Sequence, residues 1–415
     1  MEKFTVAILG CGSRGLVYSE LLNMKEEFEI NALCDTNEAQ IDKIKNILNI
    51  DVPEFLDVNE FFKKKRADVI VISTPDREHV PQVIKALNLG YDVLVEKPLT
   101  DSLKEIRALK KAQKKTGKKV MVCHVLRYGP GFVKCAELLK SGVIGKLYSI
   151  DASERVVYWH WAQAYVRGIG AYLKDSHPAI LAKCCHDLDL LQYYADSKCK
   201  SVSSVGDLLF FTPDNAPEGS ADRCTDCKYI DSCTYSAKKI YVDNWHKDNK
   251  PSFIWPYNKI TLQNPLTEDA IYEGIRTSEY GRCAFKCNTE KVDHQLVQMD
   301  FENGVKASLK MIYAAEPGRY IVFYGTDGEI IFDERDATIT VMPYGKEKYV
   351  IDVGILNGIG QSHGGGDAGL INDLYDMLTG EKECKTSLEK SLESHLMGVA
   401  AEKSRLKGGK LIKLH

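Results

Sequence analysis

Three glycines stand within six residues near the start of the chain, in the segment Gly10-Cys11-Gly12-Ser13-Arg14-Gly15. An apolar run precedes them and a helical pattern follows, which is the context in which a G-x-G-x-x-G turn binds a dinucleotide pyrophosphate. Gly12 allows the backbone to approach the phosphates, and the open N–H groups of the helix face their charge. The sequence therefore predicts a dinucleotide site made of Gly10, Cys11, Gly12, Ser13, Arg14 and Gly15.

A carboxylate closes the next strand pattern. The segment 29–34 ends at Asp35, which lies twenty positions after Gly15. At this distance a carboxylate accepts hydrogen bonds from the ribose hydroxyls and repels a 2′-phosphate. The sequence therefore predicts NAD, rather than NADP, as the cofactor.

Glu96-Lys97-Pro98 follows the apolar run 92–95 and supplies a candidate for catalysis. Ligands of open α/β sheets bind at the carboxyl ends of the strands, so Lys97 is expected where a nicotinamide and a substrate meet. Burial and neighbouring cations can lower the pKa of such a lysine until it exchanges protons near neutral pH. A surface lysine before a turn proline is the alternative interpretation.

Aromatic rings and hydrogen-bond donors lie together in Tyr158-Trp159-His160-Trp161 and in Tyr165-Val166-Arg167-Gly168. Sugars offer C–H faces to rings and hydroxyls to donors, so this segment fits a carbohydrate or polyol cleft, with an aromatic core patch as the alternative. Three glycines after His363 allow the backbone to approach a ligand, and Asp367 is expected to cap the next helix. The predicted substrate-binding residues are Trp159, His160, Tyr165, Arg167 and His363.

Cysteines gather in one part of the chain, where Cys224, Cys227 and Cys233 are followed by Cys283 and Cys287. Four thiolates close a tetrahedral structural zinc site, and the Cys-x2-Cys spacing is typical of one. The spacing differs from the common iron–sulfur runs. The sequence predicts one structural zinc held by the first three cysteines and either Cys283 or Cys287, with unligated thiols as the alternative.

The elements that must position these groups fall into two parts. In residues 1–125, continuous apolar strands alternate with amphipathic helices, which predicts a Rossmann domain with a doubly wound parallel sheet. Residues 126–415 predict an α/β domain with an open, mostly antiparallel sheet of hairpins. This second domain is expected to contain a buried helix over 179–194 and a cysteine-containing insertion at about 212–288.

The composition limits the partners. The 415 residues include 58 acidic and 55 basic side chains, and the formal net charge of −3 argues against nucleic acid and anionic membranes as partners. No run reaches the roughly 18 apolar residues that a membrane-spanning helix needs. The first strand follows Met1-Glu2-Lys3 without a signal-peptide pattern, so we expect a soluble cytoplasmic protein whose 13 cysteines are thiols or metal ligands.

The glycine turn, Asp35, Ser73-Thr74-Pro75 with His79, and Glu96-Lys97-Pro98 together resemble the Gfo/Idh/MocA family of sugar and inositol dehydrogenases. The resemblance extends to the order of the two domains, and it implies a substrate bound between them and homo-oligomers formed through the C-terminal sheet. It also implies a catalytic role for Lys97. The residues expected around the nicotinamide are Thr74, Pro75, His79, Glu96, Lys97 and Pro98.

The chain departs from this family on the helix that faces the cofactor. Family members carry a G-G-x-x-x-D-x-G-x-H pattern there, whereas here His186 fits the histidine but Ala182 stands at the aspartate position. Lys183, His186 and Asp189 are spaced three apart, so they share one face of the predicted helix and offer a substitute acid–base group. The predicted catalytic residues are Lys97, His186 and Lys183.

The expected activity is NAD-dependent oxidation of a sugar, sugar derivative or polyol, with Lys97 or His186 accepting the hydroxyl proton. The missing aspartate leaves open a glycosidase or lyase that oxidises its sugar transiently and recovers the hydride. A cofactor-binding regulatory protein without turnover is a further alternative. The products distinguish the three. A dehydrogenase forms net NADH, a glycosidase or lyase releases a leaving group without net NADH, and a regulatory protein forms neither product.

Overall fold

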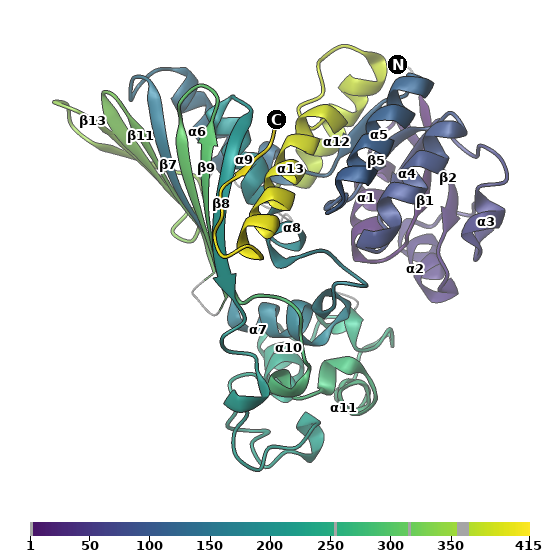
Figure 1. The fold of residues 1–415 in the computed structure, drawn as a ribbon. Coiled ribbons are helices and arrows are strands. Elements are labelled where there is room, and N and C mark those ends of the chain that lie inside the picture. The colour runs from purple at the N-terminus through teal and green to yellow at the C-terminus, as the bar shows by residue number, and fades with distance from the viewer. Residues whose placement is uncertain (1–2, 253–254, 314–316, 355–364) are drawn as a thin grey trace.

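Two sheets organise the chain, one on each side of a pair of C-terminal helices (Figure 1). The computed structural model describes residues 3–252, 255–313, 317–354 and 365–415. The N-terminal sheet is parallel and the C-terminal sheet is mostly antiparallel, so the predicted α/β class is confirmed. No helix in these described ranges is both long enough and apolar enough to span a bilayer.

The N-terminal sheet has six parallel strands in the order β3-β2-β1-β4-β5-β6. Its central strands are apolar and buried because helices cover both faces of the sheet. The strands are β1 (Phe4–Leu9), β2 (Phe28–Cys34), β3 (Glu54–Phe55), β4 (Val69–Ile72), β5 (Asp92–Val95) and β6 (Val120–Val122). The helices are α1 (Ser13–Asn23), α2 (Glu38–Leu48), α3 (Val58–Phe61), α4 (His79–Asn88) and α5 (Leu103–Thr116).

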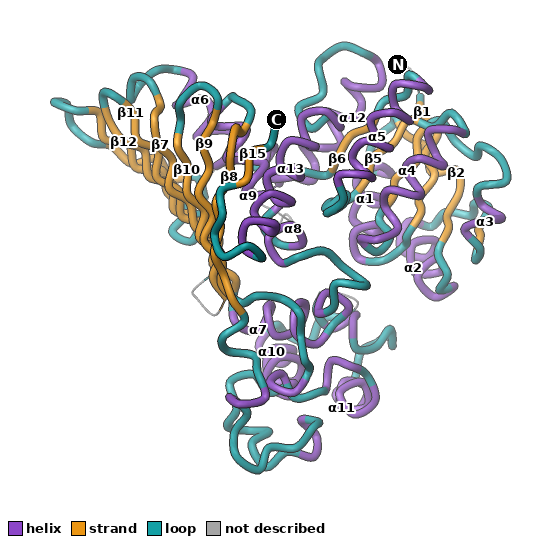
Figure 2. The backbone as a smooth tube through the Cα atoms, in the orientation of Figure 1, coloured by secondary structure: helices purple, strands orange, loops and turns teal. Residues whose placement is uncertain are grey.

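The C-terminal sheet has nine strands in the order β14-β13-β12-β11-β7-β10-β9-β8-β15 (Figure 2). Neighbouring strands are antiparallel except β7 and β10, which pair in parallel. The strands are β7 (Leu147–Val156), β8 (Cys199–Asp207), β9 (His294–Phe301), β10 (Lys306–Tyr313), β11 (Gly318–Gly325), β12 (Gly328–Asp333), β13 (Thr338–Pro343), β14 (Tyr349–Asp352) and β15 (Ile412–Lys413). The parallel pair could not be predicted from local patterns, since more than 140 residues separate its two strands.

The helices of this domain cover one face of the sheet, and a separate group of short helices lies beyond its lower end in Figure 1. The covering helices are α6 (Pro130–Lys140), α8 (Ala179–Ala182), α9 (Cys185–Ala195) and α13 (Leu388–Arg405), whereas α12 (Gly366–Thr379) packs against α1 of the N-terminal domain. The group beyond the sheet contains α7 (Tyr158–Trp161), α10 (Asn244–Lys247) and α11 (Glu268–Thr277). Residues 212–288 make up most of this group, here called the lobe, and α7 with the π-helix Ala162–Arg167 completes it.

The helix predicted over residues 179–194 is wrong, because the chain forms two helices there. α8 ends at Ala182, with Lys183 as its C-cap, and α9 begins at Cys185. At the break, the carbonyl of Ala182 accepts a hydrogen bond from Lys97 Nζ at 3.4 Å. Lys183 and His186 consequently do not share one continuous helical face.

The C-terminal helices join the two domains. α13 packs against α5 and β6 on one side and against β8 and α9 on the other. His395 of α13 accepts a hydrogen bond from the backbone N–H of Leu99 at 2.8 Å, and this bond holds the turn after Lys97. The N–H of Val122 donates to the carbonyl of Thr386 at 2.9 Å, so the chain before α13 extends the edge of the parallel sheet.

The lobe also reaches the N-terminal domain. Asn258 Nδ2 donates to Ser13 Oγ at 3.1 Å, and Ser13 is the first residue of α1. A side chain from the second domain thus touches the glycine turn of the first.

Candidate active site

The turn between β1 and α1 has the shape that a dinucleotide pyrophosphate requires. Gly10 has a φ of +91°, and a Cβ at Gly15 would lie 2.0 Å from the carbonyl oxygen of Gly10. A Cβ at Gly12 would meet nothing within 4 Å, so the space beside this residue is open. Gly12 is the N-cap of α1 and no side chain caps the helix, which leaves its first N–H groups available to an anion.

Asp35 lies at the end of β2, directly beside this turn. One of its carboxylate oxygens accepts a hydrogen bond from the N–H of Cys11 at 2.7 Å, and the other accepts from the N–H of Asn37 at 2.8 Å. These two bonds fix the orientation of the carboxylate. Asp35 remains partly exposed, so the carboxylate can accept further hydrogen bonds from a ribose.

A cavity of about 240 Å³ lies at the carboxyl ends of β4 and β5. It brings together side chains that the sequence assigned to both the cofactor and the catalytic site. The lining residues are Arg14, Ser73, Thr74, Asp76, His79, Glu96, Lys97, Cys123, Val125 and His186. His79 connects two of the lining turns, because its ring nitrogens lie 2.8 Å from the carbonyl oxygens of Thr74 and Pro98.

Lys97 is a cation in this cavity. Burial alone would lower the pKa of its ammonium group, but Cys185, Glu96 and Asp76 outweigh burial, and the pKa is raised above its ordinary value. The lowered pKa expected from the sequence is therefore wrong. An ammonium group cannot accept a proton, so Lys97 is suited to hold a substrate oxygen and stabilise negative charge on it.

Glu96 and Arg14 form the charged wall beside Lys97. Arg14 Nε lies 2.6 Å from Glu96 Oε1, and Arg14 also pairs with Asp367. Burial alone would raise the pKa of Glu96, but the positive charges of Arg14 and Lys97 outweigh burial. The pKa is therefore lowered below its ordinary value, and the carboxylate stays ionised. Asp367 does not cap α12 as predicted, because Gly365 occupies the N-cap position and the Asp367 carboxylate faces Arg14.

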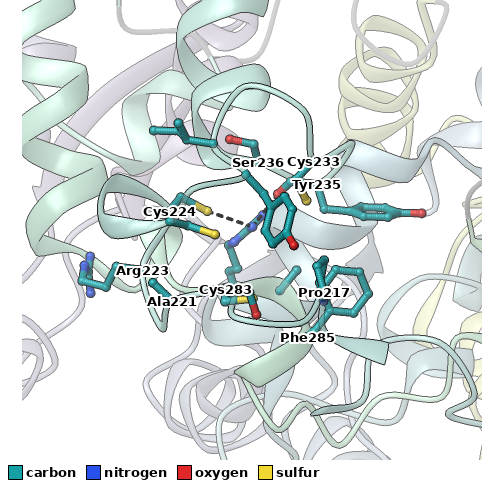
Figure 3. Close-up of a pocket in the computed structure, with 15 residues that line it drawn as sticks. Pro217, Ala221, Arg223, Cys224, Cys233, Tyr235, Ser236, Cys283 and Phe285 are labelled. Carbon is teal, nitrogen blue, oxygen red and sulfur yellow. Dashed lines mark hydrogen bonds between the residues drawn. The ribbon is translucent and has the colours of Figure 1, made fainter. Parts of the chain in front are cut away.

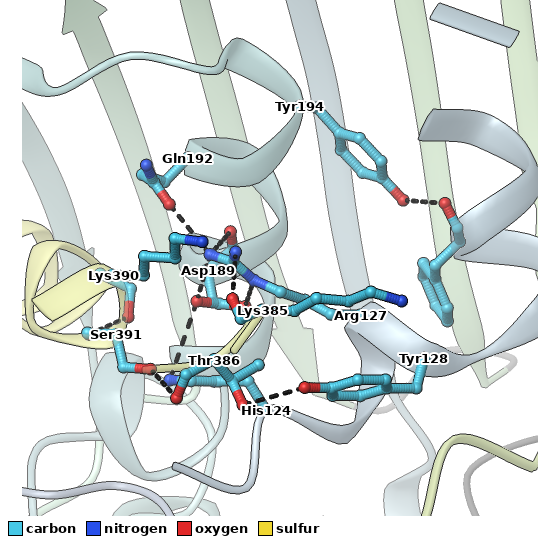
Figure 4. Close-up of polar contacts among 12 residues, drawn as sticks. His124, Arg127, Tyr128, Asp189, Gln192, Tyr194, Lys385, Thr386, Lys390 and Ser391 are labelled. Atoms are coloured by element: carbon cyan, nitrogen blue, oxygen red, sulfur yellow. Dashed lines mark hydrogen bonds and ion pairs between the residues drawn. The ribbon is translucent and has the colours of Figure 1, made fainter. Parts of the chain in front are cut away.

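His186 is carried by α9, and its ring contacts that of His124, which belongs to a buried polar cluster around Asp189 (Figure 4). Its ring centroid lies 5.8 Å from that of His124 in an edge-on arrangement. Asp189 accepts hydrogen bonds from Arg127 Nε at 2.6 Å and Nη2 at 2.8 Å, while His124 Nε2 lies 3.8 Å from the same carboxylate. Burial lowers the pKa of His124 to about 4, which keeps the ring neutral.

Lys183 forms ion pairs within a different group of charged side chains. Its Nζ lies 3.0 Å from Glu154 Oε1, and Glu154 also pairs with Arg319 at 3.0 Å. Arg319 in turn pairs with Asp187 at 2.7 Å. The substitute group of Lys183, His186 and Asp189 predicted from helical spacing is therefore not formed.

The aromatic segment lies next to these lysines. Burial is the main reason that the pKa of His160 falls well below its ordinary value, and the charges of Lys183 and Lys97 lower it further. Trp255 lies 4.7 Å from the His160 ring and 5.2 Å from the Trp159 ring, and Tyr165 stacks on His160 at 6.1 Å. Trp255 was not predicted, since it is isolated in the sequence and only the fold brings it to Trp159.

Two predicted substrate residues do not join this group. Arg167 is 1% exposed and lines a separate cavity among the cysteines of the lobe (Figure 3). His363 lies outside the described residues. Sequence reasoning also missed Asp76 and Glu154, since neither belongs to a motif, and both become recognisable only through their contacts.

All 13 cysteines are free thiols. In the ranges that the structure describes, no three His, Cys, Asp or Glu side chains are arranged to hold a metal ion. The predicted zinc site is therefore not supported.

Comparison with known protein families matches both domains. Residues 4–124 match the Gfo/Idh/MocA oxidoreductase family through its NAD-binding Rossmann fold, and residues 136–414 match its C-terminal α/β domain. The chain belongs to the Gfo/Idh/MocA oxidoreductase family. The chain is thus an NAD-dependent oxidoreductase, and its glycine turn and Asp35 lie in the part that matches the NAD-binding fold.

Two curated relatives match different shares of the chain. A putative oxidoreductase of Bacillus subtilis, YteT, is 24% identical over 89% of this chain and 88% of its own length. A glycosyl hydrolase family 109 protein of Shewanella is 29% identical over 37% of this chain and 35% of its own length. YteT therefore matches most of this chain, whereas the glycosyl hydrolase family 109 protein matches 37% of it.

Solved structures share the fold at low sequence identity. A levoglucosan dehydrogenase in complex with NADH and levoglucosan has a TM-score of 0.73 at 14% identity, over 100% of both chains. An oxidoreductase of Agrobacterium radiobacter in complex with NAD+, L-tartaric acid and magnesium has a TM-score of 0.73 at 16% identity, over 99% of this chain and 98% of the other.

Proposed function

We propose that this Gfo/Idh/MocA oxidoreductase is a dehydrogenase that oxidises a carbinol carbon of a sugar, sugar derivative or polyol with NAD. The observation that carries the proposal is that Lys97 and His186 line one cavity beside the glycine turn. The aromatic group of Trp159, His160, Tyr165 and Trp255 lies within electrostatic reach of Lys97, and its rings and donors suit a hydroxylated ring.

Different residues of the chain have different roles in such a reaction. Residues 10–15 and Asp35 hold the dinucleotide, which supplies a hydride acceptor when bound. Lys97 holds the substrate oxygen through its ammonium group, and His186 accepts the hydroxyl proton. Ionised Glu96 balances the charge of Lys97 and Arg14 throughout.

A screen with sugars, polyols and aryl glycosides tests this function. The protein is incubated with NAD, and NADH absorbance is measured together with any released leaving group. We expect stoichiometric NADH from at least one polyol or free sugar. Neither product from any compound would favour a regulatory protein.

A second function is favoured by the partial similarity to a glycosyl hydrolase family 109 protein and by Ala182 at the position of the family aspartate. In that case a glycoside is oxidised transiently, the leaving group is eliminated and the hydride returns to the sugar. A leaving group released without net NADH identifies this reaction in the same screen.

Asp35→Ala is expected to weaken NAD binding and to narrow its preference over NADP. The substitution removes the acceptor for the ribose hydroxyls and the repulsion of a 2′-phosphate. It also releases the N–H of Cys11, which Asp35 now binds at 2.7 Å. Titration of both dinucleotides against wild type and variant measures the change, and tighter binding of NADP by the wild type would contradict the assignment.

The aromatic group predicts an effect on substrate affinity. Trp255→Leu removes an aromatic face beside Trp159 and His160. The KM for the sugar substrate should therefore rise by a larger factor than the factor by which kcat falls. Trp245→Leu is a matched control, since Trp245 is buried in the same lobe and packs on His246. Equal effects of both substitutions on KM would mean that the rings act only through the stability of the lobe.

We also propose that the open face of the C-terminal sheet joins copies of this chain. Val205 and Leu296 pair directly across β8 and β9, and they are 50% and 46% exposed. Burying such a pair removes apolar surface from water on assembly. Light scattering should give a mass of at least two chains for the wild type and a smaller mass for Leu296→Lys. A monomeric wild type would contradict this interface.

A further inference from the structure

The cavity at Lys97 contains a carboxylate that does not belong to the charged wall, that of Asp76. Asp76 begins the short turn Asp76–Glu78 after β4, so it lies at the carboxyl end of the parallel sheet. In the same cavity, Arg14 and Glu96 are joined to each other at 2.6 Å. Lys97 and Asp76 are the ammonium and carboxylate groups that remain, and within the described residues neither forms an ion pair.

The two oxygens of the Asp76 carboxylate have different surroundings. Ser176 Oγ donates a hydrogen bond to Oδ2 at 2.7 Å. The other oxygen, Oδ1, accepts no hydrogen bond from the residues that the structure describes, and protein atoms do not fully enclose it. Because Asp76 lines the cavity, Oδ1 is available there as an acceptor for the hydroxyl of a ligand.

The second domain fixes the orientation of this carboxylate. Ser176 belongs to that domain, and the residue after Asp76 is held from the same side. Arg77 donates to Asp101 Oδ1 at 2.7 Å and to the carbonyl oxygen of Leu173 at 2.6 Å. The turn after β4 is therefore fastened to the second domain, so Asp76 loses little conformational freedom when a ligand binds.

Electrostatic interactions place Asp76 near both Lys97 and the aromatic group. Burial alone would lower the pKa of Lys97, and Asp76 is one of the side chains whose negative charge outweighs burial. Burial raises the pKa of Tyr165 well above its ordinary value, and the charge of Asp76 raises it further. The carboxylate is thus within reach of the lysine that holds the substrate oxygen and of a ring proposed to face the sugar.

A donor and an acceptor that do not pair with each other suit a ligand that offers both functions. The Lys97 ammonium group only donates hydrogen bonds, and the Asp76 carboxylate only accepts them. Two hydroxyls on neighbouring carbons satisfy both groups, since one accepts from Lys97 while the other donates to Asp76. A substrate with a single hydroxyl would displace water from Oδ1 without replacing its hydrogen bond, which costs affinity.

We propose that Asp76 is a substrate-binding residue that selects a vicinal diol, because its Oδ1 accepts a hydrogen bond from the hydroxyl next to the one that is oxidised. This inference rests on the proposed function, which places the reacting oxygen at Lys97. The second hydroxyl keeps its proton, and the proton of the first goes to His186. The substrate class is thus narrower than alcohols in general.

The test measures equilibrium binding of polyols to the full chain loaded with NADH, a state in which the alcohol cannot be oxidised. The probes are glucose, mannitol and myo-inositol, each with analogues in which one hydroxyl is replaced by hydrogen. For the wild type, loss of the hydroxyl at Asp76 should weaken binding about ten- to a hundred-fold, as expected for a hydrogen bond to a charged group. This ratio should fall to about two- to tenfold in Asp76→Asn and disappear in Asp76→Ala.

Two further variants separate a direct contact from a general effect on the turn. Glu78→Gln changes an exposed carboxylate of the same turn that does not line the cavity, so it should keep the wild-type ratio. Ser176→Ala removes the hydrogen bond that orients Asp76, so its ratio should lie between those of the wild type and Asp76→Ala. Thermal unfolding shows that each variant is folded.

Three results would overturn the inference. The first is an unchanged ratio in Asp76→Ala, and the second is a wild type that binds none of the polyols. In the third, Asp76→Ala changes the relative affinities for NAD and NADH but not the ratio, which would place the carboxylate against the nicotinamide. NADH formation is scored separately: a wild type that binds diols with the expected ratio but forms no NADH contradicts the proposed function and supports the role of Asp76 in binding.

Discussion

Lys97→Met and His186→Ala are each expected to lower turnover by about a hundred- to ten-thousand-fold, the usual contribution of a positioned acid–base or charge-stabilising group. Both residues line the cavity at the ends of β4 and β5 and neither belongs to the glycine turn. NAD affinity should therefore change by no more than a few-fold. Steady-state kinetics on an identified substrate, with NAD titration alongside, measures both effects.

Two other lysine variants make this prediction specific. Lys183→Met should raise KM more than it lowers kcat, because Lys183 is paired with Glu154 and, unlike Lys97 and His186, does not line the cavity. Lys118→Met changes a lysine paired with Asp92 at the far end of β5 and should behave as wild type. Turnover near the wild-type level in both Lys97→Met and His186→Ala would refute the proposed active site.

Substitutions of Gly15 and Gly12 are expected to have different effects. Gly15→Ala should lower the stability of the fold, whereas Gly12→Ala should lower the affinity for NAD. Gly15→Ala places a Cβ 2.0 Å from a backbone oxygen, so we expect a loss of about 1–3 kcal/mol in the free energy of unfolding, as for overpacked cores. Gly12→Ala has nothing within 4 Å of its Cβ, so its stability should change by less than about 0.5 kcal/mol. NAD affinity of Gly12→Ala should nevertheless fall at least about tenfold, or about 1.4 kcal/mol, because the methyl group occupies the approach to the pyrophosphate.

Thermal unfolding and NAD titration of the two variants measure these changes independently. Gly345→Ala is a reference for a glycine substitution that leaves the dinucleotide turn unchanged. This glycine lies in an exposed turn of the other domain, with a φ of +72° and open space around it. Unchanged NAD affinity in Gly12→Ala would mean that the dinucleotide does not lie over this turn.

The cofactor site was predictable from sequence because its chemistry follows from local geometry. Gly10, Gly12 and Gly15 act through the backbone of one turn, and Asp35 ends the strand beside it, so spacing alone places them. The register of a parallel sheet then brings Lys97 to the same edge. The fold class and the strands of the C-terminal hairpins follow equally from alternation and turn residues.

The substrate side was less predictable because tertiary contacts decide it. Helical spacing suggested that Lys183, His186 and Asp189 act together, but Glu154 holds Lys183 and Arg127 holds Asp189. The state of Lys97 also depends on charges from separate elements, which no local pattern reveals.

The contact between Asn258 and Ser13 connects the dinucleotide turn to a distant part of the chain. The turn around the pyrophosphate belongs to one domain, yet a side chain of the other domain touches its helix at 3.1 Å. Since this contact crosses from one domain to the other, we expect the dissociation rate of a dinucleotide bound at the turn to depend on the lobe as well as on the contacts that give affinity.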